Sequence, residues 1–146
     1  MEPVKFKRLD PAAILPTYAT PGSAGADLYA LPSGEPIVIA PGATACIRTG
    51  LAAEIPCGYV GLVFARSGLA CRQGLAPANK VGVIDSDYRG EWLIYLYNQA
   101  SEPRVINPGD RVAQLVLLPV LTPTVVEADS LDETDRGAGG FGSTGQ

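Results

Sequence analysis

The sequence predicts an all-β domain of the sandwich, jelly-roll or barrel type. Short apolar runs rich in β-branched residues recur along the chain, and turn-forming residues separate them. The 146 residues include 17 glycines and 13 prolines, which is typical of a chain whose short strands meet at tight turns. Apolar residues make up 47% of the sequence and charged residues 18%, so general disorder is excluded. A chain of this length has room for a single sizeable core.

The expected strands follow one another between Pro-Gly, Cys-Gly and Asn-Pro-Gly turn signals. They cover residues 35–40, 45–55, 59–65, 80–84, 92–98, 104–108 and 111–120. In residues 92–98, apolar side chains occupy both alternating sets of positions, so both faces of this strand are expected to be at least partly covered. Residues 82–92, GVIDSDYRGEW, predict a β-hairpin with Gly90 in its polar turn. The only helix candidate is residues 65–74, where Ser67 could cap a short helical turn.

After Val126 the composition of the chain changes. Residues 127–140, EADSLDETDRGAGG, are first acidic and then rich in glycine, with no apolar periodicity. The stretch RGAGGFGSTG, residues 136–145, cannot hold a helix or strand by itself, because glycine loses more backbone entropy on folding than any other residue. We therefore expect a single β domain of residues 1–126, followed by a flexible glycine-rich C-terminal arm of residues 127–146.

Charge and hydropathy narrow the classes of partner. With 11 Lys and Arg against 15 Asp and Glu, the net charge is −4, which argues against a broad basic surface for nucleic acid. Local arginines and a divalent cation can still bind a small ligand that carries phosphate. No apolar run is long enough to span a membrane, and no apolar region of a signal peptide follows the basic residues near the N-terminus. We expect neither a nucleic-acid nor a membrane partner.

The three cysteines, Cys46, Cys57 and Cys71, are odd in number, widely spaced and outside any CxxC pattern. This spacing predicts neither a disulfide framework nor a zinc site. We expect small buried or half-buried side chains in a reducing compartment, and hence a cytoplasmic protein.

The sequence contains no histidine, so acid–base chemistry near neutral pH must use carboxylates, tyrosine, lysine or metal-bound water. In AGADLYA, residues 24–30, Asp27 is either a turn aspartate or a carboxylate that a cation or its waters can reach. In ARSGLA, residues 65–70, Arg66, Ser67 and the amides near Gly68 form either a capped turn or an anion site.

Three further segments have both a structural and a functional interpretation. In the predicted hairpin, Asp85 follows the apolar Ile84, where partial desolvation would fix a carboxylate, and Tyr88 lies at the tip; turns also favour aspartate without any function. In GDRVAQLVL, residues 109–117, Gln114 is the polar residue inside the expected strand, and a lone strand glutamine is usually satisfied locally. The tail RGAGGFGSTG could fold over a phosphate chain and stack on a base, or serve as a linker.

Together, these five segments resemble, in sequence, order and spacing, the five motifs of the homotrimeric deoxyuridine triphosphatases (dUTPases), and they cover most of the chain. The resemblance implies a jelly-roll-like β domain, three copies of which share three interfacial sites, and an arm that closes over the bound nucleotide. It also implies a reaction that uses Mg²⁺. Water attacks the α-phosphorus of dUTP and pyrophosphate leaves, so dUMP is formed for thymidylate synthesis and uracil is kept out of DNA.

The resemblance also implies roles for individual residues. Asp85 orients and deprotonates the attacking water, Asp27 holds waters of the Mg²⁺ ion, and Tyr88 packs against the deoxyribose. The other contacts, to the uracil, the phosphates or through the arm, fall to Arg66, Ser67, Gly68, Asn79, Gly82, Val83, Ile84, Leu93, Gln114, Arg136, Phe141, Ser143 and Thr144.

Two other functions are compatible with the same fold. A dCTP deaminase must protonate and displace an amino group, and that family lacks a tail like this one. A non-catalytic nucleotide-binding protein would have no need of both Asp85 and the arm. Release of ammonia from dCTP would indicate the first, and absence of pyrophosphate release the second.

Overall fold

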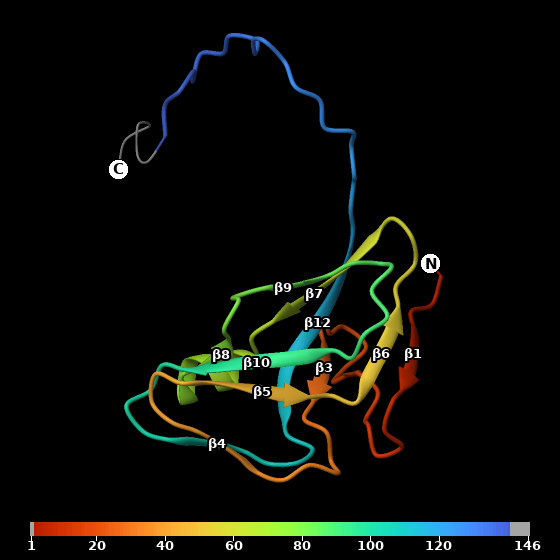
Figure 1. Cartoon of the computed structure of the whole chain (residues 1–146), viewed down its shortest axis with the longest axis vertical. Coiled ribbons are helices and arrows are strands. Elements are labelled where there is room, and N and C mark those ends of the chain that lie inside the picture. The colour runs from red at the N-terminus through yellow and green to blue at the C-terminus, as the bar shows by residue number, and fades with distance from the viewer. Residues whose placement is uncertain (1, 141–146) are drawn as a thin grey trace.

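Short antiparallel strands form the body of the protein, which is seen in a computed structural model that describes residues 2–140 (Figure 1). The elements in chain order are β1 (Lys5–Arg8), β2 (Thr17–Tyr18), β3 (Ala26–Tyr29), β4 (Ile37–Ile39), β5 (Thr44–Arg48), β6 (Leu51–Glu54), β7 (Tyr59–Phe64), η1 (Gly68–Arg72), β8 (Leu75–Pro77), β9 (Gly82–Ile84), β10 (Leu93–Asn98), β11 (Arg104–Ile106) and β12 (Arg111–Pro119). The all-β, jelly-roll-like prediction is confirmed.

Two sheets enclose most of the core. The larger sheet has the strand order β2-β3-β12-β7-β9, and the smaller one has the order β5-β10-β8. Leu28 and Val112 of the larger sheet and Ile47 and Leu96 of the smaller sheet are buried in one apolar cluster. The pairs β1-β6 and β4-β11 form two further two-stranded sheets beside these layers.

The predicted β-hairpin over residues 82–92 is wrong. β9 pairs with β7 in the larger sheet, with Ile84 opposite Gly61, whereas β10 pairs with β5 and β8 in the smaller sheet. Residues 85–91, which we call the crossing loop, therefore pass from one sheet to the other. The turn signals around Gly90 are present, but each flanking strand pairs with strands other than its neighbour along the chain.

The expected strand over residues 45–55 is divided between β5 and β6. The division falls at Gly50, whose φ of +68° is in the left-handed region. A Cβ atom at Gly50 would lie 2.7 Å from Cδ1 of Leu31, so a side chain does not fit at this corner. β1, β2, β3 and β8, which have two to four residues each, lie outside the expected ranges.

The helix candidate after β7 is a single π-helical turn, η1. The expected cap by Ser67 is wrong: its backbone already has helical angles, φ −54° and ψ −41°, and its side chain makes no capping hydrogen bond. Instead, the carbonyl of Arg66 accepts a hydrogen bond from the N–H of Ala70 at 2.9 Å. The Ser67 hydroxyl is therefore not used in the helical turn.

Two expectations about exposure need correction in the single chain. Leu93 and Tyr95 of β10 are 42% and 51% exposed, while Ile94 and Leu96 point into the core, so only one face of this strand is well covered. Cys46 is half-buried as expected, but the two cysteines at positions 57 and 71 are exposed, because they lie in a turn and on η1.

The chain leaves the sandwich after β12 (Figure 1). Residues 121–138 are exposed, and residues 120–140 contain neither a helix nor a strand. Thr134 and Gly137 form a local turn, in which the N–H of Gly137 donates to the Thr134 carbonyl at 3.0 Å. None of the helical residues in the described range 2–140 forms a stretch long and apolar enough to cross a membrane.

Candidate active site

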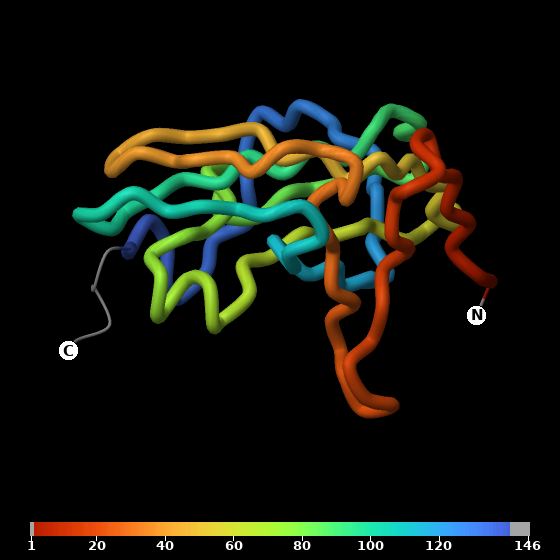
Figure 2. The backbone as a smooth tube through the Cα atoms, turned by 90° about the horizontal axis from the view of Figure 1, so that it is seen from below, coloured from red at the N-terminus to blue at the C-terminus, as the bar shows by residue number. Residues whose placement is uncertain are grey.

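One pocket collects polar residues from three separate motifs. It has a volume of about 330 Å³ and lies where the β2–β3 loop, which projects from the body in Figure 2, meets the end of β7 and the start of β12. We call it the cationic pocket. Its lining includes five residues that the sequence predicted for phosphate or metal binding: Asp27, Arg66, Ser67, Gly68 and Gln114.

Asp27 is the centre of this pocket and is only 9% exposed. Its Oδ1 accepts a hydrogen bond from Nε of Arg66 at 2.7 Å, and its Oδ2 accepts one from Nη1 of Arg111 at 3.2 Å. Two guanidinium groups thus share one carboxylate, and positive charge is left in excess. Such an excess suits phosphate oxygens, which guanidinium groups bind through charge-assisted hydrogen bonds.

Sequence reasoning missed Arg111. Strict alternation along β12 places positions 111 and 114 on opposite faces of the strand. The register of β12 against β3 shifts between Arg111 and Ala113, however, and such a bulge turns both side chains toward the same pocket. The signal was present as the arginine of the GDRVAQ segment, but only the bulge brings it to Asp27.

Gln114 is fixed in the same pocket. Its Nε2 donates to the carbonyl of Ala65 at 2.9 Å, and its Oε1 lies over Gly25, where an added Cβ would approach it to 2.5 Å. Because Gly25 has no Cβ, the side-chain amide of Gln114 has room in the pocket. Gln114 is therefore satisfied locally, and it also lines the cationic pocket.

Asp27 is the only carboxylate that lines the cationic pocket, and residues 2–140 contain no cluster of three or more metal-binding side chains. Such a donor set does not make a protein cage for a metal ion. It does fit Mg²⁺, which keeps several waters and is usually held by one or two carboxylates together with substrate phosphates.

A second pocket, of about 530 Å³, lies between β9, the crossing loop and β10. We call it the apolar pocket, since Val63, Trp92 and Ile94 form much of its wall. It brings together the residues predicted for the base and the sugar: Asn79, Gly82, Val83, Ile84, Tyr88 and Leu93. The aromatic ring of Tyr88 is held by its hydroxyl, which donates to the carbonyl of Glu91 at 3.1 Å.

Asp85 directly follows this pocket along the chain but does not line it. Its side chain is exposed, and Ile84 beside it is only half-buried, so the expected partial desolvation is wrong for the single chain. The crossing loop leaves the sheet at this residue and carries the carboxylate away from the core.

The predicted residues are divided between two pockets that share no lining residue. Strands β12 and β7 lie between Asp27 on β3 and Val83 on β9. Arg136 lines neither pocket, and its Nε donates to the carbonyl of Gly139 within the arm at 2.8 Å. Phe141, Ser143 and Thr144 lie outside the described residues.

Comparison with known proteins decides the family. A family model described as dUTPase matches residues 12–145, which is nearly the whole chain. The chain belongs to the dUTPase family. Both pockets lie within the matched range, so the cationic and the apolar pocket are parts of a dUTPase domain.

Curated relatives and solved structures agree with membership of the dUTPase family. The deoxyuridine 5'-triphosphate nucleotidohydrolase of Desulfitobacterium hafniense is 58% identical over 97% of this chain and 94% of its own length. That of Syntrophotalea carbinolica is 50% identical over 97% and 96%. A dUTPase variant of Staphylococcus bacteriophage 80alpha, solved with dUpNHpp, covers 100% of both chains with a TM-score of 0.89 and 28% identity. A variant dUTPase of phage phi11 of S. aureus, reported with a structural Mg(II) ion, has a TM-score of 0.81 at 27% identity, covering 90% of this chain and 100% of that one.

Proposed function

We propose that this chain is a dUTP diphosphatase, which hydrolyses dUTP to dUMP and pyrophosphate with the help of Mg²⁺. The observation that carries the proposal is the pair of pockets. One is apolar and bordered by strand backbone, as a base requires, and the other has two guanidinium groups around one carboxylate, as a phosphate chain with its metal ion requires. The names of the relatives support dUTP as the nucleotide.

The apolar pocket would select the base through the backbone of β9. This strand is the last one in the larger sheet, so in the described chain some backbone N–H and C=O groups between Gly82 and Ile84 face outward without a strand partner. They can bond to the O4 and N3–H of uracil, and a cytosine would leave polar groups unpaired. A methyl group at C5 would meet the same backbone, which would exclude thymine.

The sugar and the phosphates would be held by side chains. Tyr88 would fill the space that a 2′-hydroxyl needs, and Arg66, Ser67 and the amides near Gly68 would bind phosphate oxygens. Mg²⁺, held by the phosphates and through its waters by Asp27, would neutralise charge on the phosphate chain.

The hydrolysis itself would need one base. The water oxygen bonds to the α-phosphorus while its proton passes to the carboxylate of Asp85. The bond from the α-phosphorus to the oxygen that bridges to the β-phosphate breaks, and its electron pair leaves with pyrophosphate. Positioning and charge neutralisation supply the rest of the catalysis, so the absence of histidine from the chain is no obstacle.

We infer that the working form is a homotrimer with sites at its subunit interfaces. The two pockets of one chain share no lining residue, so a nucleotide can use both chemistries if one chain supplies the base pocket and another the phosphates. The exposed Leu93 and Tyr95 on β10 offer apolar surface for such contacts. In this proposal, residues 1–126 are the domain and residues 127–146 the arm that closes over a site. Native mass spectrometry measures the assembly directly.

Pyrophosphate release measured with dUTP, UTP, dTTP and dCTP tests the function. We expect kcat/KM for dUTP to exceed the other values by at least ~10²-fold, and chelation of Mg²⁺ to remove most of the activity. Ammonia release from dCTP would instead assign a deaminase, and nucleotide binding without pyrophosphate release would assign a non-catalytic protein.

A second prediction concerns the glycine under Gln114. Gly25→Ala should lower kcat/KM for dUTP by about 10-fold, because the new methyl group displaces the Gln114 amide from the cationic pocket. Gly22→Ala in the same loop is the matched control, since nothing lies within 4 Å of its added Cβ. Steady-state kinetics on both variants checks the prediction, and equal values for the two would contradict it.

A further inference from the structure

The crossing loop is fixed in different ways at its two ends. At its start, β9 holds Ile84 opposite Gly61 of β7, so Asp85 leaves directly from a paired strand. At its end, pairing with β5 begins only at Leu93, which lies opposite Arg48. The two residues before Leu93 are held by contacts outside the strand ladder.

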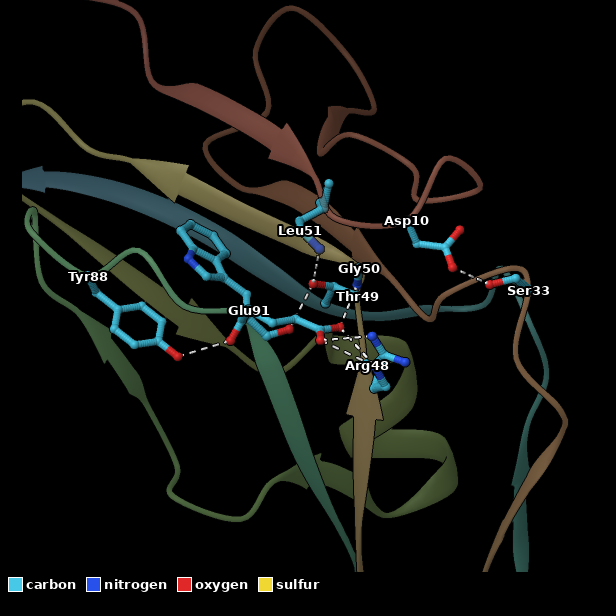
Figure 3. Close-up of polar contacts among 9 residues, drawn as sticks. Asp10, Ser33, Arg48, Thr49, Gly50, Leu51, Tyr88 and Glu91 are labelled. Atoms are coloured by element: carbon cyan, nitrogen blue, oxygen red, sulfur yellow. Dashed lines mark hydrogen bonds and ion pairs between the residues drawn. The ribbon is translucent and has the colours of Figure 1, made fainter.

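These contacts come from residues 49–51, which we call the β5–β6 corner (Figure 3). The hydroxyl of Thr49 donates to the carbonyl of Trp92 at 2.7 Å, and the N–H of Trp92 donates to the carbonyl of Leu51 at 2.8 Å. The N–H of Gly50 donates to Oε1 of Glu91 at 2.9 Å. Three successive residues of the corner thus hold Glu91, the last residue of the crossing loop, and Trp92, which follows it.

Of these three contacts, the one between the Gly50 N–H and the Glu91 carboxylate is made by a side chain of the crossing loop, whereas the other two use the backbone of Trp92. Besides the N–H of Gly50, the Glu91 carboxylate accepts hydrogen bonds from Nε and Nη2 of Arg48, the shortest at 3.0 Å. Its side chain is 18% exposed, whereas that of Arg48 is 59% exposed. An ion pair with so exposed an arginine contributes little, so the bond to the N–H of Gly50, a buried residue, is the more important one.

The direction of this N–H is not adjustable. Gly50 has a positive φ, and Leu31 and Ala13 fill the space beside it, so the corner is held in a conformation that suits glycine alone. The Glu91 side chain must therefore reach a fixed donor, and its length decides whether it does.

The same residue also holds Tyr88. The Tyr88 hydroxyl donates to the backbone carbonyl of Glu91, and its ring covers Gly90 so closely that an added Cβ there would overlap the hydroxyl. The peptide group that bears this carbonyl is thus held twice by the corner, directly through the bond from the Trp92 N–H to Leu51 and indirectly through the Glu91 side chain on the Gly50 N–H (Figure 3).

We propose that Glu91 is a positioning residue for sugar selectivity: bound to the Gly50 N–H of the β5–β6 corner, its side chain acts together with the Trp92–Leu51 backbone bond to hold the carbonyl that places the Tyr88 ring against the 2′ position of the nucleotide. This inference rests on the proposed function. Because Asp85 is held from the other end of the loop by β9, loss of the contact should change the choice between dUTP and UTP more than the turnover of dUTP.

Two variants separate the length of the side chain from its charge. Glu91→Asp keeps the charge but withdraws the carboxylate from the corner, and we expect the ratio of kcat/KM for dUTP to that for UTP to fall about 10-fold, with kcat for dUTP changed less than about 3-fold. Glu91→Gln loses the charge but keeps an oxygen within reach of Gly50, and the exposed Arg48 can move aside, so the ratio should stay within about 3-fold of the original. The matched control is Glu54→Asp, which alters the exposed Lys5–Glu54 ion pair on β1 and β6.

Tyr88→Phe tests the connection to the ring. It keeps the ring but loses the hydrogen bond to the Glu91 carbonyl, and it should also lower the dUTP/UTP ratio. The double variant Glu91→Asp with Tyr88→Phe should have about the same dUTP/UTP ratio of kcat/KM as the single variant with the lower ratio, since both substitutions act through one contact.

The outcomes distinguish the inference from the function on which it rests. A ratio unchanged in Glu91→Asp, a loss in Glu91→Gln as large as in Glu91→Asp, or fully additive losses in the double variant would overturn the positioning role while dUTP hydrolysis stands. If the unmodified protein does not hydrolyse dUTP, the proposed function itself is overturned, and the positioning role with it. Thermal unfolding of each variant checks that the fold is kept; if Glu91→Asp does not fold, Glu91→Gln and Tyr88→Phe still decide.

Discussion

Replacing Asp85 by asparagine is expected to lower kcat for dUTP by at least ~10²-fold, with little change in nucleotide binding. Asparagine has the size of aspartate and can still hydrogen-bond a water molecule, but it cannot take up the proton. The chain has no histidine to replace the lost base, and Asp27 is engaged by two arginines in the cationic pocket. Single-turnover kinetics measures the chemical step, and calorimetry with a non-hydrolysable dUTP analogue measures binding.

Asp87→Asn is the matched control for this experiment. Asp87 is another exposed aspartate of the crossing loop, two residues further along, and removing its charge changes the local potential in a similar way. We expect it to keep most of the activity. Near-normal turnover in Asp85→Asn, or an equal loss in both variants, would contradict the assignment of Asp85 as the base.

Ending the chain before Arg136 is expected to abolish most of the activity while leaving the fold intact. The deletion removes the arginine, the aromatic ring and the hydroxyls that, in our proposal, close the site over the nucleotide. Of the described residues that the deletion removes, residues 136–138 are exposed and none belongs to a helix or strand, so the melting temperature should change by less than ~2 °C. Loss of kcat/KM by ~10²-fold or more is the expected result. Leu131→Ala, at an arm residue that is 88% exposed, is a control that should keep full activity.

Mixed assemblies test whether the arm serves a neighbouring subunit. Tail-deleted chains, which keep Asp85, are combined with full-length chains that carry Asp85→Asn, after partial denaturation to exchange subunits. If each arm closes a site on another chain, some sites receive both an intact aspartate and an intact arm, and activity returns. Heterotrimers that are confirmed by native mass spectrometry and stay inactive would disprove the crossing arm.

The sequence predicted the β class and most of the strands, because alternating apolar runs between turn residues depend on local chemistry. It did not predict the partners of these strands. The segment around Gly90 has the composition of a hairpin turn, yet β9 and β10 belong to different sheets, since strand pairing is decided by the whole core. Gly50 divides an apparently continuous strand for a similar reason: the space beside it is taken by Leu31, which is distant in sequence.

The candidate site was predictable where the residues lie in recognisable motifs. Asp27, Arg66 and Gln114 come together in the cationic pocket, although they are far apart in the sequence. Arg111 was missed because a bulge changes the face on which it lies, and Glu91 because its role depends on the Gly50 N–H across the fold. Neither the register shift nor the corner has a signal in local composition.

The separation of the two pockets in one chain has a consequence for how this protein would respond to dilution. If a working site needs pockets from different subunits, the specific activity depends on the protein's own concentration. At protein concentrations below the dissociation constant of the assembly, the chains would stay folded, but each pocket would lack its counterpart from another subunit. Activity would then fall more steeply than in proportion to the protein concentration. Such a protein would lose its function by mass action well before it lost its structure.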